Sequence, residues 1–169
     1  MISDLTYKMV AYSIIEDFNP DECVDWAVEM LQAGYDTPVV GIIASMDKPV
    51  NYFEIIDYLE KALLELGISK KNGKKALFSY CIFYIIKIAK KQEVKKNLRD
   101  LVGIISGSDL MERLMDFCLL SWAWSEVDKL YNHYWSGATP ENIKRIVIST
   151  ARKWLEENKR KYEIKPLLS

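Results

Sequence analysis

One apolar stretch, KKALFSYCIFYIIKIAKK over residues 74–91, constrains the fold more than any other feature of the chain. Between Ala76 and Ile86 the only small polar side chain is that of Ser79. A helix that is apolar on all sides is typical of a protein interior, so other helices are needed to cover it. The apolar run is interrupted at Lys87, well short of the roughly 20 residues that a helix needs to cross a bilayer. The sequence therefore favours a buried helix over a membrane span.

Signals for the start of a helix recur along the rest of the chain. Asn19 and Thr37 each precede a proline, and Asn51 is followed three residues later by Glu54, as in a capping box. Together with apolar residues at spacings of three and four, these signals predict helices over residues 4–17, 21–33, 38–43, 51–66, 74–91, 93–105 and 110–124, and a last helix that begins at Thr139. A break or kink is expected near Trp124.

Glycine and proline are scarce, with seven and five residues, and no segment alternates between apolar and polar residues as a strand does. We therefore predict an all-α fold, a single compact bundle of seven or eight helices around the buried helix at about 74–91. Residues 1–162 are expected to form one helical domain. Residues 163–169 are expected to form a loose C-terminal tail.

The charges are segregated along the chain, although the net charge is only −1. Residues 1–60 hold twelve acids and two bases, whereas residues 61–99 hold eleven bases and two acids. Acidic and basic helices either attract one another within the fold or form a face that meets a charged partner, and both interpretations stay open. The chain starts without the pattern of a secretory signal, which predicts a cytoplasmic location.

Motifs of the common enzyme classes are absent from the sequence, including GxxxxGK[ST], GxGxxG, HExxH and GxSxG. The only histidine, His133, has no acid within four residues and is interpreted as a partly buried member of an aromatic cluster. The cysteines, Cys23, Cys81 and Cys118, lack metal-site spacing and are expected to be small core side chains. No catalytic residue, cofactor or metal site is predicted.

An acidic stripe stands out on the helix predicted at 21–33. Asp21, Asp25 and Glu29 are spaced four residues apart, so they lie on one helical face, where like charges repel. The stripe is either a solvated face or a surface kept for a cationic partner. Tyr35 and Asp36 follow it, and Tyr35, beside a loop glycine, is a candidate aromatic anchor.

The run WAVEMLQAGYDTPVVGIIASMDKPVNYFEIIDYLEKALLELG, residues 26–67, resembles a pattern of uncharacterised bacterial helical proteins. In that pattern a helix ends in Gly-Tyr/Leu-Asp-Thr/Ser-Pro, a short apolar helix follows, and a third helix begins at Pro-x-Asn/Asp-x-Phe-Glu and ends in Ala-Leu-x-Glu-Leu-Gly. The matching residues are Gly34, Tyr35, Asp36, Thr37, Pro38, Pro49, Asn51, Phe53, Glu54, Ala62, Leu63, Glu65, Leu66 and Gly67. The resemblance covers about a quarter of the chain, and it implies an all-helical fold and a role of the immunity-protein type.

Two hypotheses about function follow. The first is a non-catalytic protein-binding protein that neutralises a basic partner, such as a toxin, through Asp21, Asp25, Glu29, Tyr35 and Asp36 on an acidic N-terminal face. The second is a regulator or adaptor that binds nucleic acid or an acidic protein through the lysines of residues 70–99. The acidic composition, with an isoelectric point near 5.9, makes nucleic acid the less favoured partner. An enzyme of unfamiliar type is the third and least favoured hypothesis.

Overall fold

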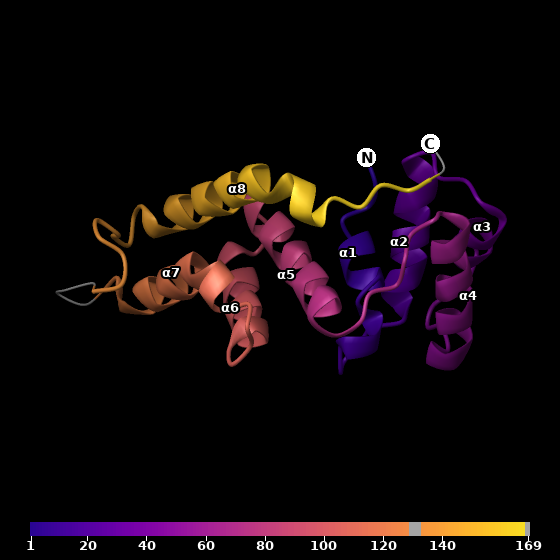
Figure 1. Ribbon diagram of the computed structural model, residues 1–169, viewed down its shortest axis with the longest axis horizontal. Coiled ribbons are helices and arrows are strands. Elements are labelled where there is room, and N and C mark those ends of the chain that lie inside the picture. The colour runs from indigo at the N-terminus through magenta and orange to yellow at the C-terminus, as the bar shows by residue number, and fades with distance from the viewer. Residues whose placement is uncertain (129–132, 168–169) are drawn as a thin grey trace. The chain divides into compact units, whose positions relative to one another are not determined.

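The computed structural model describes residues 1–128 and 133–167 (Figure 1). Over these residues it contains eight α-helices, two short 3-10 turns at Tyr12–Ile14 and Glu112–Leu114, and no strand. The helices are α1 Thr6–Met9, α2 Asp21–Gln32, α3 Pro38–Ala44, α4 Tyr52–Glu65, α5 Gly73–Ala89, α6 Val94–Ile105, α7 Met115–Glu126 and α8 Ile143–Tyr162. The predicted all-α class and the predicted number of helices are confirmed.

The starts of α3 and α4 follow from their capping residues. The Thr37 side chain accepts a hydrogen bond from the backbone N–H of Val40, and Asn51 Oδ1 accepts from the N–H groups of Phe53 and Glu54 at 3.0 and 3.2 Å. These bonds satisfy backbone donors that have no partner within the helix. Gly67 follows the end of α4 with a φ of +66°, a conformation that glycine adopts without strain.

The helix predicted over residues 4–17 is wrong in extent. α1 ends at Met9, and a 3-10 turn follows instead of further helical turns. The cause is a contact from outside the segment, because the carbonyl of Val10 accepts a hydrogen bond from the N–H of Lys71 at 2.8 Å. The N–H of Ile14, which would bond to Val10 in a continuous helix, bonds to Ala11 instead.

Two predicted helix boundaries in the second half of the chain are also wrong. α7 runs through Trp124, because the Ser125 hydroxyl donates to the carbonyls of Ser121 and Trp122 in the preceding turn and so does not cap a new helix. The last helix begins at Ile143 and not at Thr139. The side chain of Asn142 accepts from the N–H of Thr139 and donates to a loop carbonyl, which holds a turn before the helix.

The chain divides into two compact units. Unit 1 comprises residues 1–80 and 163–169, and unit 2 comprises residues 81–162. The single domain over residues 1–162 stays a prediction. Within unit 1 the backbone N–H of Leu167 donates to the carbonyl of Leu66 at 3.0 Å, and the Leu167 side chain occupies the space that a Cβ on Gly67 would need. This contact joins the C-terminal segment to the end of α4.

The core of unit 1 is built around α2. Helix α2 packs against α3, and α3 packs against α4. Trp26 is completely buried, and its indole N–H donates to the equally buried Thr6 hydroxyl at 3.0 Å. The hydrogen bond satisfies the only polar atom of the largest core side chain, so the indole is held in one orientation.

In unit 2, α6 packs against α7, and α8 packs against both. The end of α5 is capped within this unit, because the Arg152 guanidinium donates to the carbonyl of Ala89 at 3.0 Å. Most of α5 is buried, as predicted. None of the described helices combines the length and the apolar character that crossing a bilayer requires.

Candidate partner-binding surface

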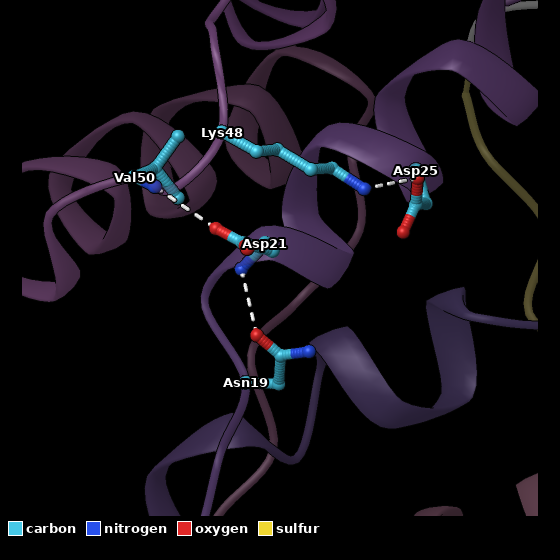
Figure 2. A network of polar contacts seen from close by, with 5 residues as sticks. All are labelled: Asn19, Asp21, Asp25, Lys48 and Val50. Carbon is cyan, nitrogen blue, oxygen red and sulfur yellow. Dashed lines mark hydrogen bonds and ion pairs between the residues drawn. The ribbon is translucent and has the colours of Figure 1, made fainter.

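The acids of α2 hold neighbouring segments of unit 1 in place (Figure 2). Asp21 Oδ1 accepts a hydrogen bond from the backbone N–H of Val50 at 2.9 Å, and the Asp21 N–H donates to Asn19 Oδ1 at 3.1 Å. Asp25 forms an ion pair with Lys48 at 2.5 Å, in which the two side chains are 52% and 38% exposed. Figure 2 shows both α2 carboxylates turned toward the connection between α3 and α4. The acidic stripe therefore has a structural role.

Replacing Asp21 by alanine is expected to lower the free energy of unfolding by about 1 kcal/mol, because the partly buried Val50 N–H loses its acceptor. Urea unfolding measures the change. Asp21→Asn keeps an oxygen at the same place and should recover most of the loss. Asp36→Ala removes an exposed carboxylate and is the matched control, for which no change is expected. Equal stability of D21A and D36A would contradict the structural role of Asp21.

The other candidate residues predicted from the sequence also lie in unit 1. Glu29 is exposed and accepts a hydrogen bond from the Ser3 hydroxyl at 2.5 Å. Asp36 is exposed, and within the described part of the chain its carboxylate has no hydrogen bond or ion pair. Tyr35 is half-buried and packs against the core. Its ring is thus less exposed than an anchor for a partner would be.

A small hollow lies where the α3–α4 connection meets the start of α4. It has a volume of about 340 Å³ and is lined by apolar side chains, including Pro49 and Ile55, and by the carboxylates of Asp47 and Glu54. Within the described residues neither carboxylate has a hydrogen bond or ion pair. The hollow, which we name the α3–α4 hollow, also includes Val50, the residue that Asp21 holds.

Two large apolar side chains project from the outer face of α4. Phe53 is 80% exposed and Leu64 is 79% exposed, and they lie roughly 16 Å apart along the helix axis. Asp57 and Glu60 lie between them on the same face. This face was not predicted from the sequence, although a signal for it is present, because both residues are apolar at positions outside the buried stripe of the helix.

The other end of α4 borders a larger hollow of about 790 Å³, lined in part by Leu64, Gly67 and Ser69. At its edge a polar cluster joins three elements of unit 1. Tyr12 donates to Glu60, and Lys70 Nζ lies 2.7 Å from both the Tyr12 hydroxyl and a Glu60 carboxylate oxygen.

The pKa values in this cluster shift away from those of acid–base catalysts. Burial, and then the bond to Glu60, raises the pKa of Tyr12. The bond from Lys70 lowers the pKa of Glu60, and the same bond raises the pKa of Lys70. All three groups therefore keep their usual protonation states at neutral pH, whereas a general base needs a pKa near the working pH. The cluster is suited to fastening α4 to its neighbours.

The cysteines are buried and free, as predicted, and burial raises the pKa of Cys23 and of Cys81 to about 12. His133 is exposed, so the prediction of a partly buried histidine is wrong. Of the neighbouring segment, residues 131 and 132 lie outside the described residues. In the described part of the chain, no three histidine, cysteine or acidic side chains are arranged to hold a metal ion.

No family model, curated protein or solved structure matches the chain. The function is therefore inferred from the surface of the molecule. In unit 1 that surface combines exposed acids with the exposed side chain of Phe53 and, at the same end of α4, a hollow lined in part by Asp47 and Glu54.

Proposed function

We propose that this protein is a non-catalytic protein-binding protein of the immunity type, which neutralises a basic partner such as a toxin through the acidic surface of unit 1. The observation that carries the proposal is the α3–α4 hollow, in which Asp47 and Glu54 have no partner among the described residues, at the same end of α4 as the exposed side chain of Phe53. Aromatic side chains are enriched in protein–protein interfaces, and exposed carboxylates attract a basic partner.

The α3–α4 hollow suits one long cationic side chain of a partner. A lysine or arginine that enters it places its charge near Asp47 and Glu54, and its aliphatic stem against Pro49 and Val50. Phe53, exposed at the same end of α4, adds apolar surface that a partner can cover.

The α2 acids act at longer range in this proposal. Asp25, Glu29 and Asp36 are exposed and add to the negative field that a basic partner meets as it approaches. Asp25 already has a partner in Lys48, but the pair is about half exposed and is worth little in isolation, so a cation from the partner can replace Lys48.

Support for binding, as opposed to catalysis, comes from the cluster of titratable side chains at the edge of the 790 Å³ hollow in unit 1. Tyr12, Glu60 and Lys70 bond to one another and keep their usual protonation states at neutral pH. They fasten α4 to its neighbours and leave Phe53, Asp57 and Leu64 of its outer face available to a partner.

Affinity capture from the organism that encodes the chain tests the proposal, with nuclease treatment to remove nucleic acid. The original protein should retain a basic protein at low salt, and the Asp25→Lys/Glu29→Lys variant should release it. The association rate of this partner with the variant should be lower by about tenfold or more, which is the size of effect that electrostatic steering produces. Surface plasmon resonance with the purified partner measures the rates.

The matched control is Glu112→Lys/Asp116→Lys, which changes two exposed acids at the same spacing in unit 2 and so changes the net charge equally. Its association rate should stay close to that of the original protein. If the two variants slow association equally, net charge and not the acidic surface of unit 1 governs binding. If no protein partner is retained, the proposal fails.

A further inference from the structure

The lysines of residues 70–99 do not form one continuous surface. Lys70 is held by Tyr12 and Glu60, and Lys71 is half-buried near the Ser79 hydroxyl, all in unit 1. In unit 2 the Lys87 ammonium lies over a phenylalanine ring at 5.0 Å. A binding site in this segment can therefore be formed only by those cations that lie close together.

Three cations gather at a hollow between α6 and α7. The hollow has a volume of about 440 Å³, a size common for small-ligand sites. Its polar and aromatic lining consists of Lys95, Lys96 and Arg99 from α6 with Ser121, Trp124 and Ser125 from α7. No acid of the described chain belongs to the lining. The Lys95 ammonium lies 5.7 Å from the centre of the Trp124 ring, so a cation already occupies the aromatic face.

Two of these cations have only weak partners within the protein. Lys96 lies 3.5 Å from Glu93, and Arg99 lies 3.8 Å from Asp100. Lys96, Glu93 and Arg99 are more than half exposed, and ion pairs of this kind contribute little because water screens them. The positive charges are therefore available to an anion that enters the hollow.

We propose that the α6–α7 hollow binds a nucleoside phosphate, whose base stacks on Trp124 and whose phosphate contacts Lys95, Lys96 and Arg99. On binding, Lys95 turns from the indole to the phosphate, and the base takes its place on the ring. Stacking of a base on an aromatic side chain together with cationic contacts to phosphate is the general chemistry of nucleotide and single-strand binding. The Ser121 hydroxyl, at the wall of the hollow, is in reach of the sugar or phosphate.

The same chemistry is supplied by a free nucleotide and by one nucleotide of a single strand. Because the site lies in unit 2 and is basic, it is independent of the acidic surface of unit 1 and goes beyond the proposed function. Failure of protein binding at unit 1 leaves it untouched.

Isothermal titration calorimetry with AMP, ATP and inorganic phosphate, and fluorescence polarisation with a labelled single-stranded oligoribonucleotide, test the proposal on the full chain. Lys95→Ala/Arg99→Ala should weaken binding of the nucleotide or the strand by about tenfold or more. The matched control, Lys144→Ala/Arg145→Ala, removes two exposed cations of α8 in the same unit and should leave the affinity unchanged. Trp124→Ala should weaken binding about as much, whereas Trp124→Phe keeps an aromatic face and should lose less.

Each result bears on the proposal. Tighter binding of ATP than of the strand identifies a free nucleotide as the ligand, whereas tighter, strongly salt-dependent binding of the strand identifies single-stranded nucleic acid. Inorganic phosphate that binds as well as AMP would overturn the proposal, because the base would then contribute nothing. Absence of binding by every probe, or equal weakening by the α6 and α8 variants, would overturn it as well.

Discussion

Replacing Trp26 by alanine is expected to lower the free energy of unfolding by about 3–5 kcal/mol, the usual cost of deleting a large buried aromatic side chain. Trp26 is completely buried in α2. Whole domains are commonly stable by only about 5–15 kcal/mol, so this loss is a large part of the total. The variant should therefore unfold at a much lower urea concentration than the original protein. Urea unfolding followed by circular dichroism measures the loss.

Two milder variants separate the causes of that loss. Trp26→Phe keeps most of the apolar volume but removes the indole N–H, and Thr6→Val removes the hydroxyl that accepts from it at 3.0 Å. Each should lower the free energy of unfolding by less than Trp26→Ala does. The loss of the hydrogen bond should account for about 1 kcal/mol of the change. A loss of under 1 kcal/mol in Trp26→Ala would show that the cavity collapses, and would contradict the central place of Trp26 in the core of unit 1.

The helices that the sequence predicted best are those whose boundaries are local. α3 begins at the residue after Thr37 and α4 at the residue after Asn51, as expected, since each cap acts on backbone groups two or three residues away. Gly67, which follows α4, has a positive φ within its own turn, although the glycine also makes room for the distant Leu167 side chain. Such signals are complete within a short window of sequence.

The wrong boundaries depend on hydrogen bonds that the spacing of apolar residues does not contain. Helix α1 is short because Lys71, from a distant loop, takes the carbonyl of Val10. The start of α8, in contrast, depends on local bonds, because the Asn142 side chain accepts from the N–H of Thr139 and donates to the carbonyl of Gly137 and so holds a turn before the helix. Apolar spacing reports which residues face the core, but not which backbone groups another segment will claim.

The candidate partner-binding surface was also predicted only in part from the sequence. The sequence placed Asp21, Asp25 and Glu29 on one face of α2, but their partners within the protein, Val50, Lys48 and Ser3, are 29, 23 and 26 residues away. The structural role of the acidic stripe could not be read from helical spacing alone. The α3–α4 hollow likewise depends on how the connection between the two helices folds back.

Replacing Phe53 by alanine should weaken binding of the captured basic partner by about thirtyfold or more, which corresponds to the 2 kcal/mol or more that defines a hot spot. The folded protein should lose almost no stability, because the ring is 80% exposed and rests mainly against Tyr52, at a centroid distance of 5.5 Å. Isothermal titration calorimetry and urea unfolding on the same preparation measure the two quantities.

Leu64→Ala is the matched control for Phe53, because it removes an equally exposed apolar side chain from the other end of α4. If the partner docks at the α3–α4 hollow, this variant should cost less than 1 kcal/mol of binding, as most residues outside a hot spot do. Equal losses from both variants would extend the interface along the whole outer face of α4. Unchanged affinity in Phe53→Ala would remove the aromatic anchor from the proposal and leave Asp47 and Glu54 of the hollow to carry the binding.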